Sequence, residues 1–269
     1  MKLSRWLNYL LLFTLCFLPL ICLAAAADKK WYVGINENDE YIYLMTIDED
    51  PYEDYLETIG YTEEEIDQII DWMDLDEDYE AIKIYILKIN DEEHKYYGSE
   101  GVQYYYNRYV SEDRAADNWE LQGHNKEGFI FKYTDQRKLY KDSVSASRGL
   151  GAFFVANDVD WKHLASKVDD SFERLYDNED AGAKGINDGI STFYKPDTFG
   201  KTYLEKFRSK SIYNSQGVLT YYEWSYNNDL ILKYELEMAF FFEYWVIVLI
   251  IAFIAVIIVI ISIKKSESP

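Results

Sequence analysis

Residues 244–263 form an uncharged apolar run that restricts the possible folds of this chain more than any other feature. The run has 20 residues, and 15 of them are Val, Ile, Leu or Phe. About 20 helical residues cross a hydrocarbon core that is about 30 Å thick. A single span must be helical, because it has to satisfy its own backbone hydrogen bonds. The run therefore predicts a transmembrane helix, and a buried core helix is the alternative.

The two ends of the chain predict its orientation in the membrane. Residues 1–27 combine a basic start, an apolar run and an A-x-A sequence, which is typical of a secretory signal peptide cleaved after Ala27. An uncleaved signal anchor is the alternative, and both place residues 28–243 outside the cytoplasm. Lys264 and Lys265 follow the apolar run, so the positive-inside rule places the tail, residues 264–269, in the cytoplasm.

Both cysteines of the chain, Cys16 and Cys22, lie in this leader. A lipoprotein site at Cys22 is a further alternative, although "LPLIC" lacks the small residue that normally precedes such a cysteine. If the leader is removed, the mature chain has no disulfide and no thiolate metal site.

The part of the chain between the leader and the apolar run is strongly acidic. The whole chain has a net charge of −21, of which the leader contributes +2 and the tail +1, so residues 28–243 carry −24. Such a surface repels nucleic acid and attracts cations or basic proteins. The 216 residues are enough for one large core or two modest ones, with a possible division near residue 145.

Alternating apolar residues and two amphipathic patterns predict an α+β fold. Strands are predicted at residues 39–47, 80–89, 101–110, 128–134, 217–226 and 230–238, with loops at residues 111–127 and 177–189. A capping box at Thr62 and Glu65 begins a helix over residues 62–73. A second helix is predicted over residues 160–176, with Asp158 or Asp160 as its cap.

These elements predict a curved antiparallel sheet with the two helices on its concave face, followed by the transmembrane helix. Asn227, Asn228 and Asp229 separate the last two strands and are suited to the left-handed turn of a hairpin. Two consecutive α+β halves are the alternative architecture.

Three stretches, "VGINENDEYIYLM", "FFVANDVDWKHL" and "SQGVLTYYEWSY", resemble parts of uncharacterised archaeal secreted proteins that carry a C-terminal membrane anchor. Those proteins have a Gly-Asp pair in the first strand, whereas this chain has Asn38, Asp39 and Glu40. The resemblance implies a β-rich, membrane-anchored architecture and no particular chemistry.

No catalytic, cofactor-binding or metal-binding residue is predicted. The three histidines, His94, His124 and His163, belong to no metalloprotease pattern, and G-x-S-x-G does not occur. Gly149 and Gly151 lack the third glycine of a dinucleotide loop. Asp74, Asp76 and Asp78 have the spacing of a calcium loop, but Tyr79 and Tyr85 replace its glycine and glutamate, so only an irregular cation site at residues 74–80 or 48–54 remains.

The tyrosines of residues 104–109 have two interpretations, either a carbohydrate-binding or apolar groove or half-buried sheet packing. The sequence as a whole predicts a single-pass, membrane-anchored cell-surface domain of binding or structural type. A surface hydrolase with dispersed catalytic residues and a carrier of lipid or another apolar ligand are the alternatives. A filled core without a pocket would favour the binding module. A deep apolar pocket would favour the carrier, and a cleft with His beside Ser or Asp would favour the hydrolase.

Overall fold

The computed structural model describes residues 32–73, 75, 79–96, 99–113, 118–132, 152–172, 180–198, 201–202, 205–240, 250–251, 253–254 and 257. The predicted leader, the predicted tail and most of the predicted transmembrane span lie outside these residues. Within the described part of the chain, no helix is both long enough and apolar enough to cross a membrane.

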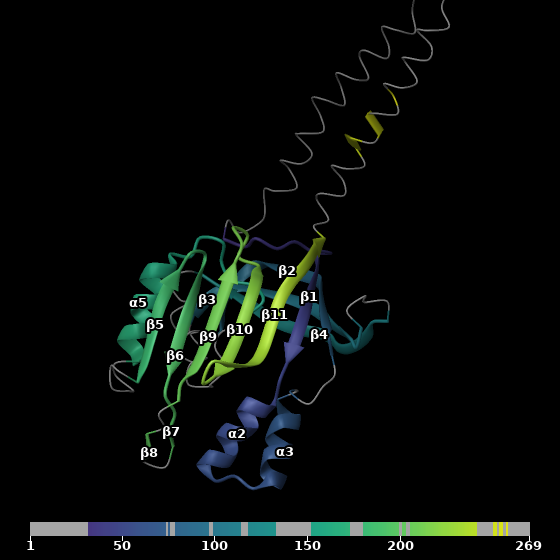
Figure 1. Ribbon diagram of the computed structural model, residues 1–269. Helices are drawn as coiled ribbons and strands as arrows, with labels where there is room; N and C mark the ends of the chain where they lie inside the picture. Colours follow the sequence, from purple (N-terminus) through teal and green to yellow (C-terminus); the bar gives the residue numbers. More distant parts are fainter. Residues whose placement is uncertain are drawn as a thin grey trace, which may run out of the picture.

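Nine antiparallel strands form one open, curved sheet in the order β4-β3-β2-β1-β11-β10-β9-β6-β5 (Figure 1). Its strands are β1 (Glu40–Ile47), β2 (Ala81–Tyr96), β3 (Ser99–Ser111), β4 (Glu120–Phe131), β5 (Ala181–Ile186), β6 (Gly189–Tyr194), β9 (Phe207–Tyr213), β10 (Leu219–Tyr226) and β11 (Asp229–Phe240). A separate two-stranded ribbon joins β7 (Asp197–Thr198) to β8 (Lys201–Thr202).

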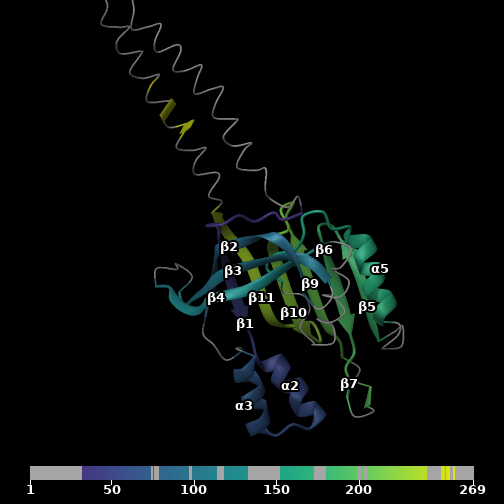
Figure 2. The same cartoon turned by 180° about the vertical axis from the view of Figure 1, so that it is seen from behind.

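The first and last strands, β1 and β11, pair at the centre of the sheet from Glu40↔Phe240 to Ile47↔Leu232. The strands before and after residue 145 therefore belong to one sheet. β2, β3 and β4 curl across β9, β10 and β11 (Figure 2), so the sheet encloses the core between its two ends. The prediction of a curved antiparallel sheet is confirmed.

Most predicted strands are present, but two predicted loops are partly wrong. The β4 strand begins at Glu120, within the predicted loop 111–127, and β5 with the start of β6 occupies the predicted loop 177–189. β4 is an edge strand with mostly exposed side chains, and β5 is an edge strand with the sequence AGAKGI. Both lack the alternating large apolar residues by which half-buried strands are recognised.

The hairpin between β10 and β11 has the predicted turn. Asn227 and Asn228 have φ angles of 51° and 75°, the left-handed conformation that asparagine tolerates. On β11, Leu232, Tyr234 and Leu236 pack against the core. Ile231 is also fully buried, because the irregularity opposite Trp224 and Ser225 interrupts the alternation of faces, and the Ile231 carbonyl accepts a hydrogen bond from the Asp48 amide at 2.9 Å.

The two predicted helices are α3 (Glu63–Trp72) and α5 (Trp161–Phe172). The Glu65 carboxylate accepts a hydrogen bond from the Thr62 amide at 2.9 Å, which is one of the bonds of the predicted capping box, and a second from the Thr62 hydroxyl at 2.9 Å. Asp160 caps α5 by accepting a hydrogen bond from the His163 amide at 3.1 Å. The predicted apolar stripe of α5 is buried: Leu164, Ala165, Val168 and Phe172.

The prediction of two helices in the folded domain is wrong, because a third, α2 (Asp50–Ile59), lies between β1 and α3. Pro51 rules out a continuous strand here, but it stands in the first turn of a helix, where its missing amide costs nothing. α2 ends at Gly60, which has a φ of 98° and caps the last carbonyls. Because Glu53 and Asp54 separate Tyr52 from Tyr55 and Leu56, the apolar face of α2 is short and the segment resembles an acidic loop in the sequence.

The concave face of the sheet is filled by residues 152–156. The Phe154 ring lies 4.9 Å from the ring of Tyr41 and 5.5 Å from that of Tyr104, while the Phe153 ring lies 4.9 Å from that of Tyr43. The segment is held by backbone hydrogen bonds from Val155 to Gly217 and from Leu219 to Phe153, each 2.8 Å long. Gly217 has a φ of 74°, and a Cβ atom there would lie 2.1 Å from the Val155 carbonyl oxygen, so only glycine fits.

A second group of aromatic rings joins α2 to the sheet. Phe207 on β9 lies at its centre, with ring centroids 4.8 Å from Tyr55, 5.6 Å from Trp224 and 4.7 Å from Tyr226. α2 therefore covers the inner face at one end of the sheet, while α5 covers β5 and β6. At the opposite end of the sheet from α2 and α3, β11 runs out to Phe240 (Figure 1).

Candidate functional site

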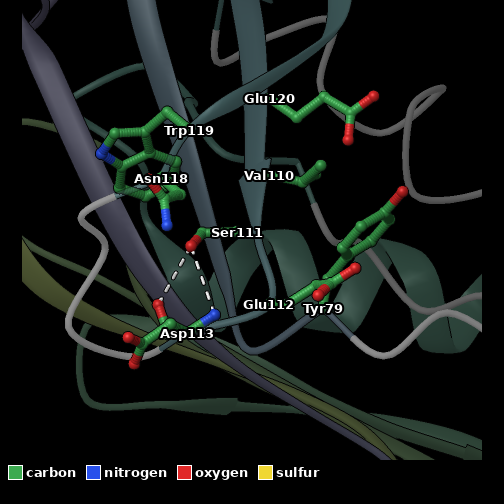
Figure 3. Close-up of a pocket in the computed structure, with 8 residues that line it drawn as sticks. All are labelled: Tyr79, Val110, Ser111, Glu112, Asp113, Asn118, Trp119 and Glu120. Atoms are coloured by element: carbon green, nitrogen blue, oxygen red, sulfur yellow. Dashed lines mark hydrogen bonds between the residues drawn. The ribbon is translucent and has the colours of Figure 1, made fainter.

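A surface pocket of about 760 Å³ lies where β3 ends and β4 begins (Figure 3). It is lined by Tyr79, Val110, Ser111, Glu112, Asp113, Asn118, Trp119 and Glu120. Its position follows from the sheet: β3 delivers residues 110–113, β4 opens with residues 118–120, and Tyr79 precedes β2, which pairs with β3. The volume lies within the range of about 300–1,000 Å³ that is usual for small-molecule sites.

The floor of the pocket is fixed by Ser111. This residue is 3% exposed, and its hydroxyl donates a hydrogen bond to the Asp113 carbonyl at 3.1 Å while accepting one from the Asp113 amide at 3.2 Å (Figure 3). The Ser111 carbonyl also accepts a hydrogen bond from the Glu80 amide at 3.0 Å. These bonds hold the end of β3 in a tight turn, which directs the side chains of Glu112 and Asp113 into solvent.

The lining is acidic with one large aromatic wall. Glu112, Asp113 and Glu120 contribute three exposed carboxylates, and Asn118 adds an exposed amide. The Lys83 ammonium lies 4.5 Å from the centroid of the Trp119 ring. The Trp119 ring therefore already has one cation against it, which orients the indole beside the carboxylates.

Away from the pocket, the carboxylate of Asp39 has a structural role. Asp39 is fully buried and accepts hydrogen bonds from the Asn36 amide at 2.7 Å and the Tyr41 hydroxyl at 3.0 Å. Burial, together with the Asp39 carboxylate, raises the pKa of Tyr41 far above its ordinary value. These bonds tie the turn before β1 to the core and leave Asp39 inaccessible to a ligand.

The structure places the three histidines on three different elements. His94 lies on β2, His124 on β4 and His163 on α5, and all three side chains are exposed. Across the described residues, no group of three or more His, Cys, Asp or Glu side chains has an arrangement suited to a metal ion. Asp74, Asp76, Asp78, Gly149 and Gly151, named from the sequence, lie outside the described residues.

The tyrosines of β3 divide between the core and the pocket region. Tyr104 is 7% exposed, and its ring lies 5.6 Å from the ring of Tyr106, as sheet packing predicts. Tyr109 is half-buried, and its ring centroid lies 4.8 Å from the Lys83 ammonium, the same cation that lies against Trp119. Tyr109 therefore supports the wall of the pocket without lining it.

No family model, curated protein or solved structure matches this chain. The resemblance to archaeal secreted proteins therefore stays a prediction. Functional conclusions have to come from the fold and from the pocket itself.

The pocket was missed from the sequence because six of its eight lining residues lie in a segment predicted to be one polar loop, residues 111–127. The available signal was "NWEL" (residues 118–121), in which Trp119 stands alone among polar residues with Leu121 two positions later. That spacing is compatible with a short alternating strand, and a tryptophan at its start would then lie at the edge of the sheet.

Proposed function

We propose that this chain is a single-pass membrane protein whose described domain lies outside the cytoplasm and acts as a binding module. The observation that carries the proposal is the filled concave face. Phe153, Phe154 and the tyrosines around them occupy the space in which a lipid carrier would hold its ligand. Recognition therefore has to use the outer surface, and the pocket between β3 and β4 is the candidate site on it.

The membrane anchor rests on residues 244–263 and on the few described residues within them. Ile251, Phe253 and Ile254 are helical, with exposed fractions of 61%, 63% and 41%. Apolar side chains this exposed require a non-aqueous environment or a partner. Phe240 ends β11 only four residues before this run, so the end of the sheet that carries Phe240 would stand at the bilayer surface.

The orientation is tested by protease digestion of intact cells expressing the full chain with an epitope at its C-terminus. We expect digestion of the acidic domain and protection of the epitope, because residues 264–269 face the cytoplasm in the proposed topology. Protection of the domain with loss of the epitope would reverse the topology. Permeabilised cells, in which both parts become accessible, provide the control.

The pocket chemistry favours a small organic cation. Three carboxylates line the pocket and none of the lining residues is basic, although the Lys83 ammonium lies against the Trp119 ring. The Tyr79 ring offers a face for the apolar part of an amine. Carbohydrate is the other ligand class that an aromatic wall with hydrogen-bond acceptors can hold. An amine should bind more tightly, because the exposed carboxylates attract it before contact.

The pocket is tested by melting the full chain in uncharged detergent with and without spermidine at constant ionic strength. A ligand that binds only the native state raises the midpoint. We expect a rise that the double variant Glu112→Gln/Glu120→Gln reduces by at least half, while the matched variant Glu92→Gln/Asp158→Asn, on exposed residues away from the pocket, leaves it unchanged. An unchanged midpoint for the original chain would refute the cation assignment, and a rise with neutral sugars alone would assign the pocket to carbohydrate.

A further inference from the structure

The negative charge of the chain is concentrated at the end of the sheet that carries α2 and α3. Residues 48–80 contain 16 Asp or Glu and no Lys, Arg or His, and 11 of these 16 lie in residues 48–73, which the structure describes. We call α2, α3 and the described residues next to them, 48–73, the helical lobe. Most of its carboxylates are exposed: Asp48, Asp50, Asp54, Glu57, Glu63, Glu64, Glu65, Asp67 and Asp71.

The carboxylates of the helical lobe repel one another. Burial, followed by the neighbouring carboxylates of Asp50 and Asp67, raises the pKa of Glu53 above its ordinary value. Asp50 belongs to α2 and Asp67 to α3, so the repulsion acts across the pair of helices. Carboxylates that repel one another in the free protein gain from any positively charged surface that covers them.

The lobe also presents a large aromatic side chain to solvent. Trp72, the last residue of α3, is 79% exposed, and Tyr61, just before α3, is 37% exposed. Residues spaced by three, four or seven positions share one face of a helix, so Glu65, Gln68 and Trp72 form one exposed stripe. Asp71, three positions after Gln68, lies next to this stripe, and Asp67 is exposed one turn before Asp71. The buried residues of α3, Ile66 and Ile70, lie on the opposite side of the helix from this stripe.

The position of the lobe makes it accessible. α2 and α3 lie at the end of the sheet opposite Phe240 (Figures 1 and 2). β11 has 12 residues, which corresponds to about 40 Å of extended chain. With the anchor placed as proposed above, the helical lobe lies at the end of the described domain that points away from the bilayer.

We infer that the exposed face of α3 is a docking surface for a lysine- or arginine-rich segment of another protein, with Trp72 as its apolar anchor. Charge complementarity selects the basic partner, because every charged side chain of residues 48–73 is an Asp or a Glu. Tryptophan is the residue most enriched among those that dominate binding energy at protein interfaces, and surrounding charged groups govern the rate of encounter. A second copy of this chain does not fit, since it would bring two acidic faces together.

The test measures binding of a fluorescent peptide of lysine and alanine with one central leucine to the full chain in uncharged detergent. Trp72→Ala is expected to weaken binding about tenfold or more, and Trp72→Phe, which keeps a ring, should retain most of the affinity. Asp67→Asn/Asp71→Asn is expected to weaken binding about tenfold at low salt and to reduce its salt dependence. The double variant should not unfold the lobe, because it removes charges that repel one another.

The matched control is Glu92→Gln/Asp158→Asn, which removes two exposed carboxylates outside the lobe and should change the affinity less than twofold. Equal losses in the control and in the lobe variant would mean general attraction to an acidic protein, and would overturn the inference. Unchanged binding by Trp72→Ala would do the same. Neither result would affect the proposal for the pocket between β3 and β4, because that proposal is tested with other variants and with spermidine.

Discussion

Replacing Phe154 by alanine is expected to lower the free energy of unfolding by about 3–5 kcal/mol, the usual cost of removing a buried phenylalanine ring. Phe154 is 2% exposed, and its ring contacts Tyr41 on β1 and Tyr104 on β3. Residues 152–156, which carry Phe154, pack on the concave face and are not a strand of the nine-stranded sheet. The strands around Phe154 therefore cannot fill the cavity left by the ring unless the sheet bends. Denaturant unfolding of the full chain in detergent, followed by circular dichroism, measures this loss.

Leu121→Ala is the control for this variant, because Leu121 is 47% exposed and its truncation should change stability by less than about 0.5 kcal/mol. A Phe154→Ala variant as stable as the control would mean that residues 152–156 lie on the sheet without filling it. The concave face would then be available to an apolar ligand, and the carrier function would replace the binding module.

Raising the pH above about 10 is expected to unfold the domain cooperatively. Burial is the main cause that raises the pKa of Tyr41, Tyr43, Tyr104 and Tyr213 well above the ordinary value of 10. The unfolded chain releases these four protons near pH 10, whereas the folded chain keeps them. Their stabilisation is therefore complete below pH 10 and is lost as the pH rises from there towards the folded-state values.

The expected loss is about 1.4 kcal/mol per pH unit for each buried tyrosine, or about 5 kcal/mol per unit for the four together. A domain with a typical stability of about 5–15 kcal/mol should unfold within two or three pH units above 10. Tyrosinate absorbance should rise in two phases, a gradual one from exposed tyrosines and a steep one that coincides with loss of the circular dichroism signal. A single gradual phase with the native signal retained would contradict the burial of these hydroxyls.

Tyr43→Phe refines the alkaline experiment. The Tyr43 hydroxyl is buried, and within the described residues it has no hydrogen-bond partner. Its removal keeps the ring against Phe153 and should leave stability at neutral pH unchanged or slightly higher, because no hydrogen bond is lost. With one ionising group fewer, the alkaline midpoint should move upward.

The sequence predicted those parts of the fold in which local pattern and tertiary packing agree. Ile82, Ile84 and Ile86 alternate along β2 and are all buried, and Thr62 and Glu65 cap α3 as their spacing requires. The predictions were wrong for those elements whose structure depends on tertiary packing and whose local sequence shows no helical or strand pattern. β5 is an edge strand of small residues that α5 covers, and α2 is an acidic segment whose Tyr52 and Tyr55 pack against Phe207 on β9 and Tyr226 on β10.

The candidate site was harder to predict than the fold. Glu112, Asp113 and Glu120 are ordinary surface residues in the sequence, and they share a pocket only because β3 and β4 are neighbouring strands of the sheet. Lys83 comes from a third strand, and its position against Trp119 depends on the pairing of β2 with β3. The acidity of residues 48–80 is visible in the sequence, whereas its separation from the proposed membrane end depends on the path of β1 and β11.

The pairing of β1 with β11 has a consequence for synthesis. The two central strands are separated by about 190 residues in the chain, so the hydrogen bonds that join the halves of the sheet form only after the last strand has left the ribosome. Loop closure over that distance opposes early pairing, and such a topology folds slowly. The edge of β1 that will receive β11 is therefore open while the rest of the chain is being made, and it requires protection from foreign strands during that interval.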